Sequence, residues 1–197
     1  MRAAAVVVVC AVVLGACGGG GRSATSASST TSVSAGASTS SSASTSAPTA
    51  GAATGASTTP VSAAPTHPTA HLVAVRAARQ QTVDRVVFEF SERVPGYKVS
   101  YVKKPIVQTS GREVPISANF VLEVRMEQAS GFNQDTGQPT YTGGTPIRPA
   151  GTRAVGEVAQ VEDFEGVLTW VAGLNADVPF RVSTLSAPPR LVIDVPS

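Results

Sequence analysis

Cysteine is almost absent from this sequence of 197 residues, since only Cys10 and Cys17 occur and both lie within the first seventeen positions. From Gly18 onward there is no pair of cysteines that a disulfide could join. Histidine is equally scarce, with His67 and His71 as its two occurrences. A zinc site needs several cysteine, histidine or carboxylate ligands that converge, and the sequence offers few of them. We therefore predict a folded domain without disulfides, metal or other cofactor.

The scarcity of histidine also argues against a hydrolase. A serine hydrolase needs a base beside its nucleophile, and both histidines lie before or at the first strand-like segment. A glycosidase needs two carboxylates, for which the candidates are Glu162, Asp163 and Glu165. Charged residues are mostly exposed, so such a cluster is more typical of a solvated turn. The sequence predicts a protein that is not an enzyme.

The charge balance disfavours a nucleic-acid partner. The chain has 15 basic and 13 acidic residues, and two of the basic ones, Arg2 and Arg22, precede residue 71. The remaining region, residues 71–197, is formally neutral. Because a nucleic-acid surface needs clustered excess positive charge, we expect no nucleic-acid binding.

An apolar stretch opens the sequence and ends at the second cysteine. A basic residue at position 2 is followed by an almost unbroken apolar run over residues 3–14, which is typical of a secretory signal. About a dozen residues are too few to span roughly 30 Å of hydrocarbon as a permanent helix. The motif LGAC, residues 14–17, resembles a lipobox, in which the cysteine receives a lipid. We predict a lipoprotein signal peptide over residues 1–16 and a lipid on Cys17 that anchors the protein to the extracytoplasmic side of the cell membrane.

A low-complexity segment follows the signal. Residues 18–70 consist of Gly, Ala, Ser, Thr and Pro, with the exceptions Arg22, Val33, Val61 and His67. Such a composition has too little apolar bulk to offset the entropy of ordering. We predict a disordered tether over residues 17–70, whose Ser/Thr content also suits an O-glycosylated stalk, followed by one folded domain at residues 71–197.

Alternation of apolar and polar residues dominates the region of the predicted domain. The segments DRVVFEF (84–90), YKVSYV (97–102) and FVLEVRME (120–127) each place their apolar residues on one face of a strand. Turn signals rich in Gly and Pro separate these segments. Seven or eight short strands at this spacing predict an all-β fold, an antiparallel sandwich or barrel. One short helix is expected around Val158 to Phe164, where the alternation fades.

The C-terminal stretch PFRVSTLSAPPRLVIDV predicts a hairpin with a defined register. A four-residue loop at positions 186–189 places Leu185 opposite Arg190 and Arg181 opposite Asp194. The apolar residues then share one face, and Arg181 and Asp194 form a cross-strand pair of opposite charge on the other face. Such a pair contributes about 0.2–1 kcal/mol.

A polar loop and two aromatic residues could each bind a ligand, and each also has a purely structural interpretation. The stretch NQDTGQ, residues 133–138, has the alternating oxygens of a calcium loop, but Gly144 stands where a bidentate acid is required, so a hairpin turn is favoured. Trp170 lies in the apolar segment VLTWVAGL, which favours a core position over sugar stacking. Tyr141, in a Gly-rich turn region, is the better candidate for a surface contact.

Several motifs in a fixed order carry a family resemblance. The stretches DRVVFEF, PGYKVSYV, PTYTG, DFEGVLTW and PFRV, with the closing PPRLVIDV, are similar to the AMIN-like domain of actinobacterial lipoproteins, which is related to the amidase N-terminal domain. The resemblance covers residues 73–195. It implies a compact antiparallel β-sandwich and a role in binding the cell envelope, and it brings no catalytic activity. Twelve arginines against three lysines fit the high-GC genome that this resemblance suggests.

We therefore expect a membrane-tethered lipoprotein whose β domain binds an envelope polymer, above all peptidoglycan. Tyr141 and Arg190 are the candidate ligand-binding residues, since an arginine can hold a carboxylate of a peptide stem through two parallel hydrogen bonds. The alternative is a structural or adaptor lipoprotein whose sheet face docks an envelope partner protein.

Overall fold

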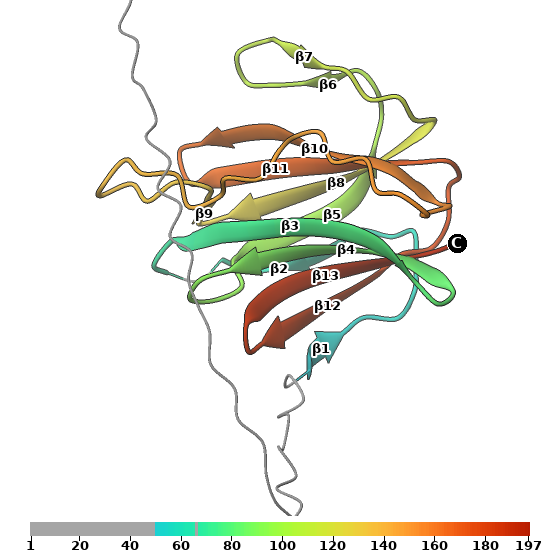
Figure 1. Ribbon diagram of the computed structural model, residues 1–197, viewed down its shortest axis with the longest axis horizontal. Helices are drawn as coiled ribbons and strands as arrows, with labels where there is room; N and C mark the ends of the chain where they lie inside the picture. Colours follow the sequence, from blue (N-terminus) through green and yellow to red (C-terminus); the bar gives the residue numbers. More distant parts are fainter. Residues whose placement is uncertain (1–49, 66) are drawn as a thin grey trace, which may run out of the picture. The chain divides into compact units, whose positions relative to one another are not determined.

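The computed structural model describes residues 50–65 and 67–197, and it is all-β (Figure 1). Within these residues there is no helix, so none is long and apolar enough to cross a membrane. Cys17, the predicted signal peptide and the first part of the predicted tether lie outside the described residues. The thirteen strands are β1 (Ala50–Ala53), β2 (Val61–Ala63), β3 (Ala70–Gln80), β4 (Val83–Phe90), β5 (Gly96–Val102), β6 (Ile106–Val107), β7 (Glu113–Val114), β8 (Phe120–Glu127), β9 (Ala129–Ser130), β10 (Val155–Phe164), β11 (Val167–Leu174), β12 (Arg181–Ser186) and β13 (Pro189–Pro196).

Two large sheets form a sandwich, as expected from the alternating segments (Figure 1). One sheet has six strands in the order β1-β12-β13-β4-β3-β9, and the other has five in the order β10-β11-β8-β5-β2. Neighbouring strands are antiparallel, except for the short parallel pair of β3 and β9. The strands β6 and β7 pair only with each other.

A single apolar core fills the space between the two large sheets. Val86, Phe88 and Phe90 on β4 are at most 1% exposed, so the predicted face of this strand is the buried one. Trp170 on β11 is fully buried and meets Phe88 edge to face, with ring centroids 5.9 Å apart. The preference for a core position of the tryptophan is confirmed, and the two sheets are joined by aromatic contact as well as by aliphatic packing.

The short helix expected around Val158 to Phe164 is wrong, because these residues belong to strand β10. The register of β10 with β11 shifts twice, between Val155 and Glu157 and again between Gln160 and Glu162. Each irregularity adds a residue that changes which side chains face the core. The apolar alternation therefore fades in the sequence although the strand continues.

Residues 50–65, which we call the N-terminal strap, are part of the described structure, and the disorder predicted for the tether is wrong for residues 53–65. Strand β1 pairs with β12 in the six-stranded sheet, and β2 pairs with β5 in the five-stranded sheet. Between them, the N–H groups of Thr54 and Ser57 donate to the carbonyl oxygens of Val182 and Phe180 at 2.9 and 3.0 Å. Backbone hydrogen bonds of this kind are open to any residue except proline, which explains why composition gave no sign of them.

A hairpin formed by β6 and β7 packs on the outer face of the five-stranded sheet (Figure 1). Ile106 and Ile116, which are 6% and 8% exposed, form a second core with Val121 and Val171 of the sheet below. Gly173 allows this close approach, since a Cβ at this position would lie 2.8 Å from the Cβ of Ala118. The hairpin therefore covers part of a sheet face that would otherwise be open to solvent.

Candidate functional site

The C-terminal hairpin has the predicted register. Arg181 lies opposite Asp194 and Leu185 lies opposite Arg190. The predicted ion pair, however, has a different partner. The carboxylate of Asp194 accepts two hydrogen bonds from Arg85, from Nε at 2.7 Å and from Nη2 at 2.8 Å. Arg85 lies directly opposite Asp194 on β4, so Asp194 has an arginine on each side, Arg85 and Arg181. Its carboxylate binds Arg85 through two guanidinium nitrogens.

Arginines gather on the outer face of the six-stranded sheet. The registers of β3, β4, β12 and β13 place the same-face residues in adjacent cross-strand rows. We call this surface the arginine face; it comprises Arg76, Arg85, Arg181, Arg190, Glu89, Asp194, Val87 and Val192. Four guanidinium groups stand against two carboxylates, so this face carries an excess of two positive charges in a domain that is neutral overall.

Both carboxylates of the arginine face form an ion pair with an arginine of the same face. Glu89 forms an ion pair with Arg76, and Asp194 binds Arg85. Arg181 is exposed and forms no hydrogen bond or ion pair with any described residue. Arg190 is half-buried, and its guanidinium donates only to the carbonyl oxygen of Pro188, at 3.3 Å. Arg181 and Arg190 thus have no carboxylate partner among the described residues.

Tyr141 occupies a different part of the molecule from Arg190. Its ring packs edge to face against Trp170 with centroids 5.4 Å apart and an interplanar angle of 87°. Its hydroxyl donates to the carbonyl oxygen of Gly144 at 2.9 Å, and partial burial raises the pKa of the phenol. The half-buried ring thus packs against the main core. The two predicted ligand-binding residues do not form one site.

The three acidic residues near the end of β10 have separate roles. Glu162 accepts hydrogen bonds from the backbone N–H and the hydroxyl of Thr109 in the β6–β7 hairpin. Asp163 accepts from the N–H of Gly131 at 2.7 Å, and Glu165 lies in the β10–β11 turn with φ of 50°. Carboxylates directed to such different partners do not form a catalytic pair.

The pKa values of buried Asp84 and half-buried Asp163 are shifted in opposite directions. Burial raises the pKa of Asp84, but the backbone N–H groups of Val155, Ala154 and Arg153, which all donate to its Oδ2, outweigh burial and hold the pKa below its usual value. Burial also raises the pKa of Asp163, and here the donor at Gly131 does not compensate. Asp84 holds the segment that leads into β10 in place. The hydrogen bonds stabilise its charged form by more than burial destabilises that form.

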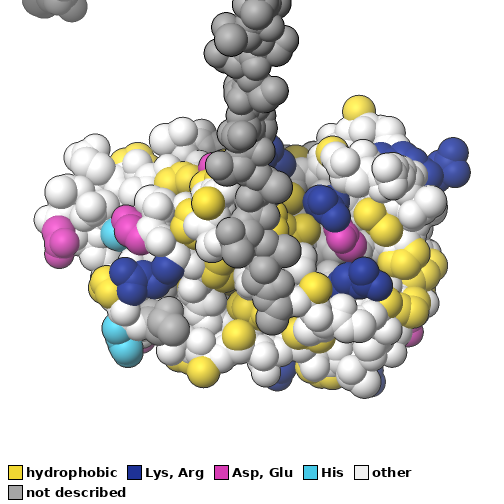
Figure 2. Space-filling model, turned by 90° about the horizontal axis from the view of Figure 1, so that it is seen from below, with side chains coloured by type: hydrophobic (Ala, Val, Ile, Leu, Met, Phe, Trp, Pro, Cys, Tyr) yellow, Lys and Arg dark blue, Asp and Glu magenta, His cyan; other side chains and the backbone are white. Residues whose placement is uncertain are grey.

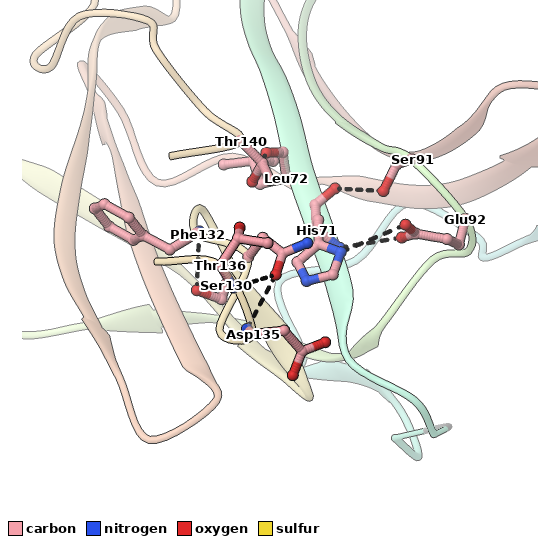
Figure 3. A network of polar contacts seen from close by, with 10 residues as sticks. His71, Leu72, Ser91, Glu92, Ser130, Phe132, Asp135, Thr136 and Thr140 are labelled. Atoms are coloured by element: carbon pink, nitrogen blue, oxygen red, sulfur yellow. Dashed lines mark hydrogen bonds and ion pairs between the residues drawn. The ribbon is translucent and has the colours of Figure 1, made fainter. Parts of the chain in front are cut away.

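The loop at residues 133–138 is a hairpin turn, as favoured over a calcium loop. The side-chain oxygen of Asn133 accepts from the N–H groups of Asp135 and Thr136 at 3.0 and 3.1 Å (Figure 3). Gly137 has φ of +68°, a conformation that favours glycine. Beside this loop, His71 Nδ1 lies 3.4 Å from the carboxylate of Glu92 (Figure 3).

The described residues hold no metal cluster, and the face seen in Figure 2 carries side chains of both charges. Residues 50–65 and 67–197 hold no group of three or more His, Cys, Asp or Glu side chains placed to bind a metal ion. Figure 2 shows basic side chains beside acidic ones, with apolar side chains scattered between them.

A family model for the AMIN-like domain matches residues 70–197. The chain belongs to the AMIN-like domain family. The match covers the resemblance seen in the sequence and places the arginine face within an AMIN-like domain, which is a non-catalytic binding domain; no catalytic family was found. No curated protein and no solved structure was found to match the chain.

The AMIN-like match begins at residue 70, so the N-terminal strap precedes it. Sequence reasoning identified Arg181, Arg190 and Asp194 but missed Arg76 and Arg85. The signal for Arg85 was its place on the polar side of DRVVFEF. Using that signal requires knowing that β4 is the neighbour of β13, which the alternation of either strand does not show.

Proposed function

We propose that the AMIN-like domain binds peptidoglycan without catalysis, through the arginine face. The observation that carries the proposal is that Arg181 and Arg190, two guanidinium groups without a carboxylate partner among the described residues, share one sheet face of a neutral domain. The peptide stems of peptidoglycan carry carboxylates, and a guanidinium group holds a carboxylate through two parallel hydrogen bonds.

The spacing of the two arginines suits a polymer with repeated carboxylates. Arg181 lies opposite Asp194, which is four residues along β13 from Arg190. At about 3.3 Å per residue, the two arginines are separated by about 13 Å along the strand direction.

We further propose that a lipid on Cys17 holds the chain at the extracytoplasmic side of the cell membrane. Cys17 and the first described residue, Ala50, are separated by 33 positions. A chain of this length spans at most about 120 Å. The anchor would thus keep the domain near the membrane, and the many equivalent sites of a wall polymer would compensate for weak binding at each one.

Retention on isolated wall sacculi tests the proposal. Residues 18–197, which lack the lipid attachment site, should be retained with a Kd between micromolar and millimolar. The double variant Arg181→Ala/Arg190→Ala should lose at least about ten-fold in affinity, which corresponds to two arginine–carboxylate contacts. Arg153→Ala is the matched control, because Arg153 is exposed in the turn before β10 and is not one of the residues of the arginine face.

Two results would contradict the proposal. One is that sacculi retain no more of the wild-type chain than of an unrelated β-sandwich, in which case an adaptor role that docks an envelope protein takes its place. The other is that the double variant binds as well as Arg153→Ala does. Melting temperatures control for folding, and neither arginine forms an ion pair with a described residue that its loss would break.

A further inference from the structure

A second candidate site lies on the other sheet, away from the arginine face. The β6–β7 hairpin leaves a groove of about 400 Å³ between itself and the outer face of the five-stranded sheet. We call it the hairpin groove; its lining residues are Val102, Lys103, Pro105, Ile106, Val107, Gln108, Thr109, Glu123, Arg125, Val161, Glu162 and Thr169. Its volume lies within the range of about 300–1,000 Å³ that is usual for small-molecule sites.

The wall of the groove is held in place by two side chains of the hairpin connection. Gln108 donates from Nε2 to the carbonyl oxygen of Val161. Thr109 donates from its hydroxyl to the carboxylate of Glu162 at 2.6 Å. Both partners belong to β10, so the hairpin is fixed to the sheet and the groove exists without a ligand. A preformed site loses less entropy when it binds.

The floor of the groove offers polar groups of opposite charge. Glu123 and Arg125 lie two residues apart on β8, and Thr169 lies opposite Arg125 on β11. Glu123 is half-buried and Thr169 is 7% exposed, yet neither side chain forms a hydrogen bond with a described residue. The one described contact of the Arg125 guanidinium is with Glu127, at 3.4 Å. A carboxylate and a guanidinium group therefore share one groove floor without binding each other.

We propose that the hairpin groove binds a zwitterionic amino acid or short peptide, with the ligand ammonium group on Glu123 and its carboxylate on Arg125. At about 3.3–3.4 Å per residue, the Cα atoms of Glu123 and Arg125 are about 7 Å apart. Two charge-assisted hydrogen bonds of about 2.8 Å each leave room between the two side chains for a ligand with adjacent charges. A ligand with one charge would leave the other group on the floor unpaired.

The remaining lining residues set the size and polarity of this ligand. Val102, Pro105 and Val107 form an apolar wall, and Val161 faces the same groove from β10. A small apolar side chain, such as a methyl group, suits these walls, while large or charged side chains do not gain from them. Lys103 is exposed at the groove and adds a second cation for the carboxylate.

Alanine and dialanine are suitable probes, titrated into ¹⁵N-labelled residues 18–197 and followed by backbone amide shifts. Saturable shifts are expected at Glu123, Arg125 and Thr169, with a Kd of about 0.1–10 mM for a ligand that makes two ionic contacts. N-acetylalanine, which lacks the ammonium group, and alaninamide, which lacks the carboxylate, should each bind at least ten-fold more weakly than alanine.

Isosteric variants test which charged group of the ligand each of the two residues binds. Glu123→Gln should weaken alanine at least ten-fold and leave the weak binding of N-acetylalanine unchanged. Arg125→Gln should weaken alanine similarly and leave alaninamide unchanged. Glu113→Gln and Arg153→Gln are the matched controls, because neither residue lines the hairpin groove and both are exposed. All four should bind sacculi like the wild type, so this proposal fails or succeeds independently of the arginine face.

Three outcomes would overturn the proposal. The first is the absence of saturable shifts at the groove residues with up to about 50 mM alanine or dialanine, well above the expected Kd. The second is equal binding of alanine and its two derivatives, which would show that the zwitterion is not recognised. The third is that Glu123→Gln and Arg125→Gln, at unchanged melting temperature, bind alanine as the two control variants do.

Discussion

Replacing Gly96 by alanine tests whether the N-terminal strap is part of the folded domain. Gly96 is buried at the start of β5, where Pro65 of the strap crosses it. A Cβ at this position would lie 2.5 Å from the backbone N of Pro65 and 2.7 Å from its Cβ. Atoms do not approach this closely, so the strap has to move away from β5.

The expected loss follows from what the strap contributes at this point. Strand β2 pairs three residues with β5, and half-buried Val61 packs against the main core. Loss of about half of a valine burial costs about 1 kcal/mol. Two or so ladder hydrogen bonds cost about 0.5–1.5 kcal/mol each, and the chain entropy regained by the released strap offsets part of the sum. We expect a net loss of about 1–3 kcal/mol, or about 3–10 °C in melting temperature.

Urea unfolding measures this loss, with the fluorescence of buried Trp170 as the probe. The measurement is made for Gly96→Ala in residues 18–197 and again in residues 71–197, which lack the strap. In the shorter chain the same substitution should be neutral or stabilising by up to about 1 kcal/mol, because alanine has fewer unfolded conformations than glycine. An equal loss in both chains would refute the reasoning, since the strap could not then be its cause.

Three other changes have expected outcomes of their own. Asp84→Asn should cost about 1–3 kcal/mol at pH 7, because the three N–H donors lose a charged acceptor. Since the folded state lowers the pKa of Asp84, the advantage of the wild type should vanish as the pH falls below 3.8 in urea titrations. Asp163→Asn should show the opposite dependence. The pKa of Asp163 is raised, so its stabilising contribution is present at low pH and lost as the pH rises through that pKa; the variant should equal or exceed the wild type at pH 7. Cys17→Ala should move the protein from the membrane fraction to the soluble or unprocessed pool; unchanged fractionation would point to another anchor.

The elements predicted well are those in which one sheet face is buried and the other is exposed. On β4 the buried apolar residues Val86, Phe88 and Phe90 are those that the sequence indicated. On β8 the prediction holds for Leu122, Val124 and Met126, but Phe120 is exposed and Val121 is buried in the second core. The β12–β13 register was predictable because a short loop and two alternating strands leave one pairing that matches apolar with apolar residues. A shift by one residue would have moved every apolar side chain to the solvent face.

Features that depend on contacts between distant segments were not predictable. Composition cannot show that the strap completes two sheet edges, because β1 and β2 are held mainly by backbone hydrogen bonds. The partner of Asp194 depended on the order of strands in the sheet, which placed Arg85 beside it. Likewise, the sequence places Glu123 and Arg125 on the solvent face of β8. Only the structure shows that they share a groove with residues of the β6–β7 hairpin.

The two candidate sites lie on opposite outer faces of one sandwich, and this placement separates their functions. The arginine face presents exposed Arg181 and half-buried Arg190 about four residues apart along the strand direction, so it suits a polymer with repeated carboxylates. The hairpin groove is bounded by a wall and holds about 400 Å³, so it suits a ligand end or a free small molecule. The two proposals together describe a domain that would hold a wall polymer on one side and an amino acid or a peptide end on the other.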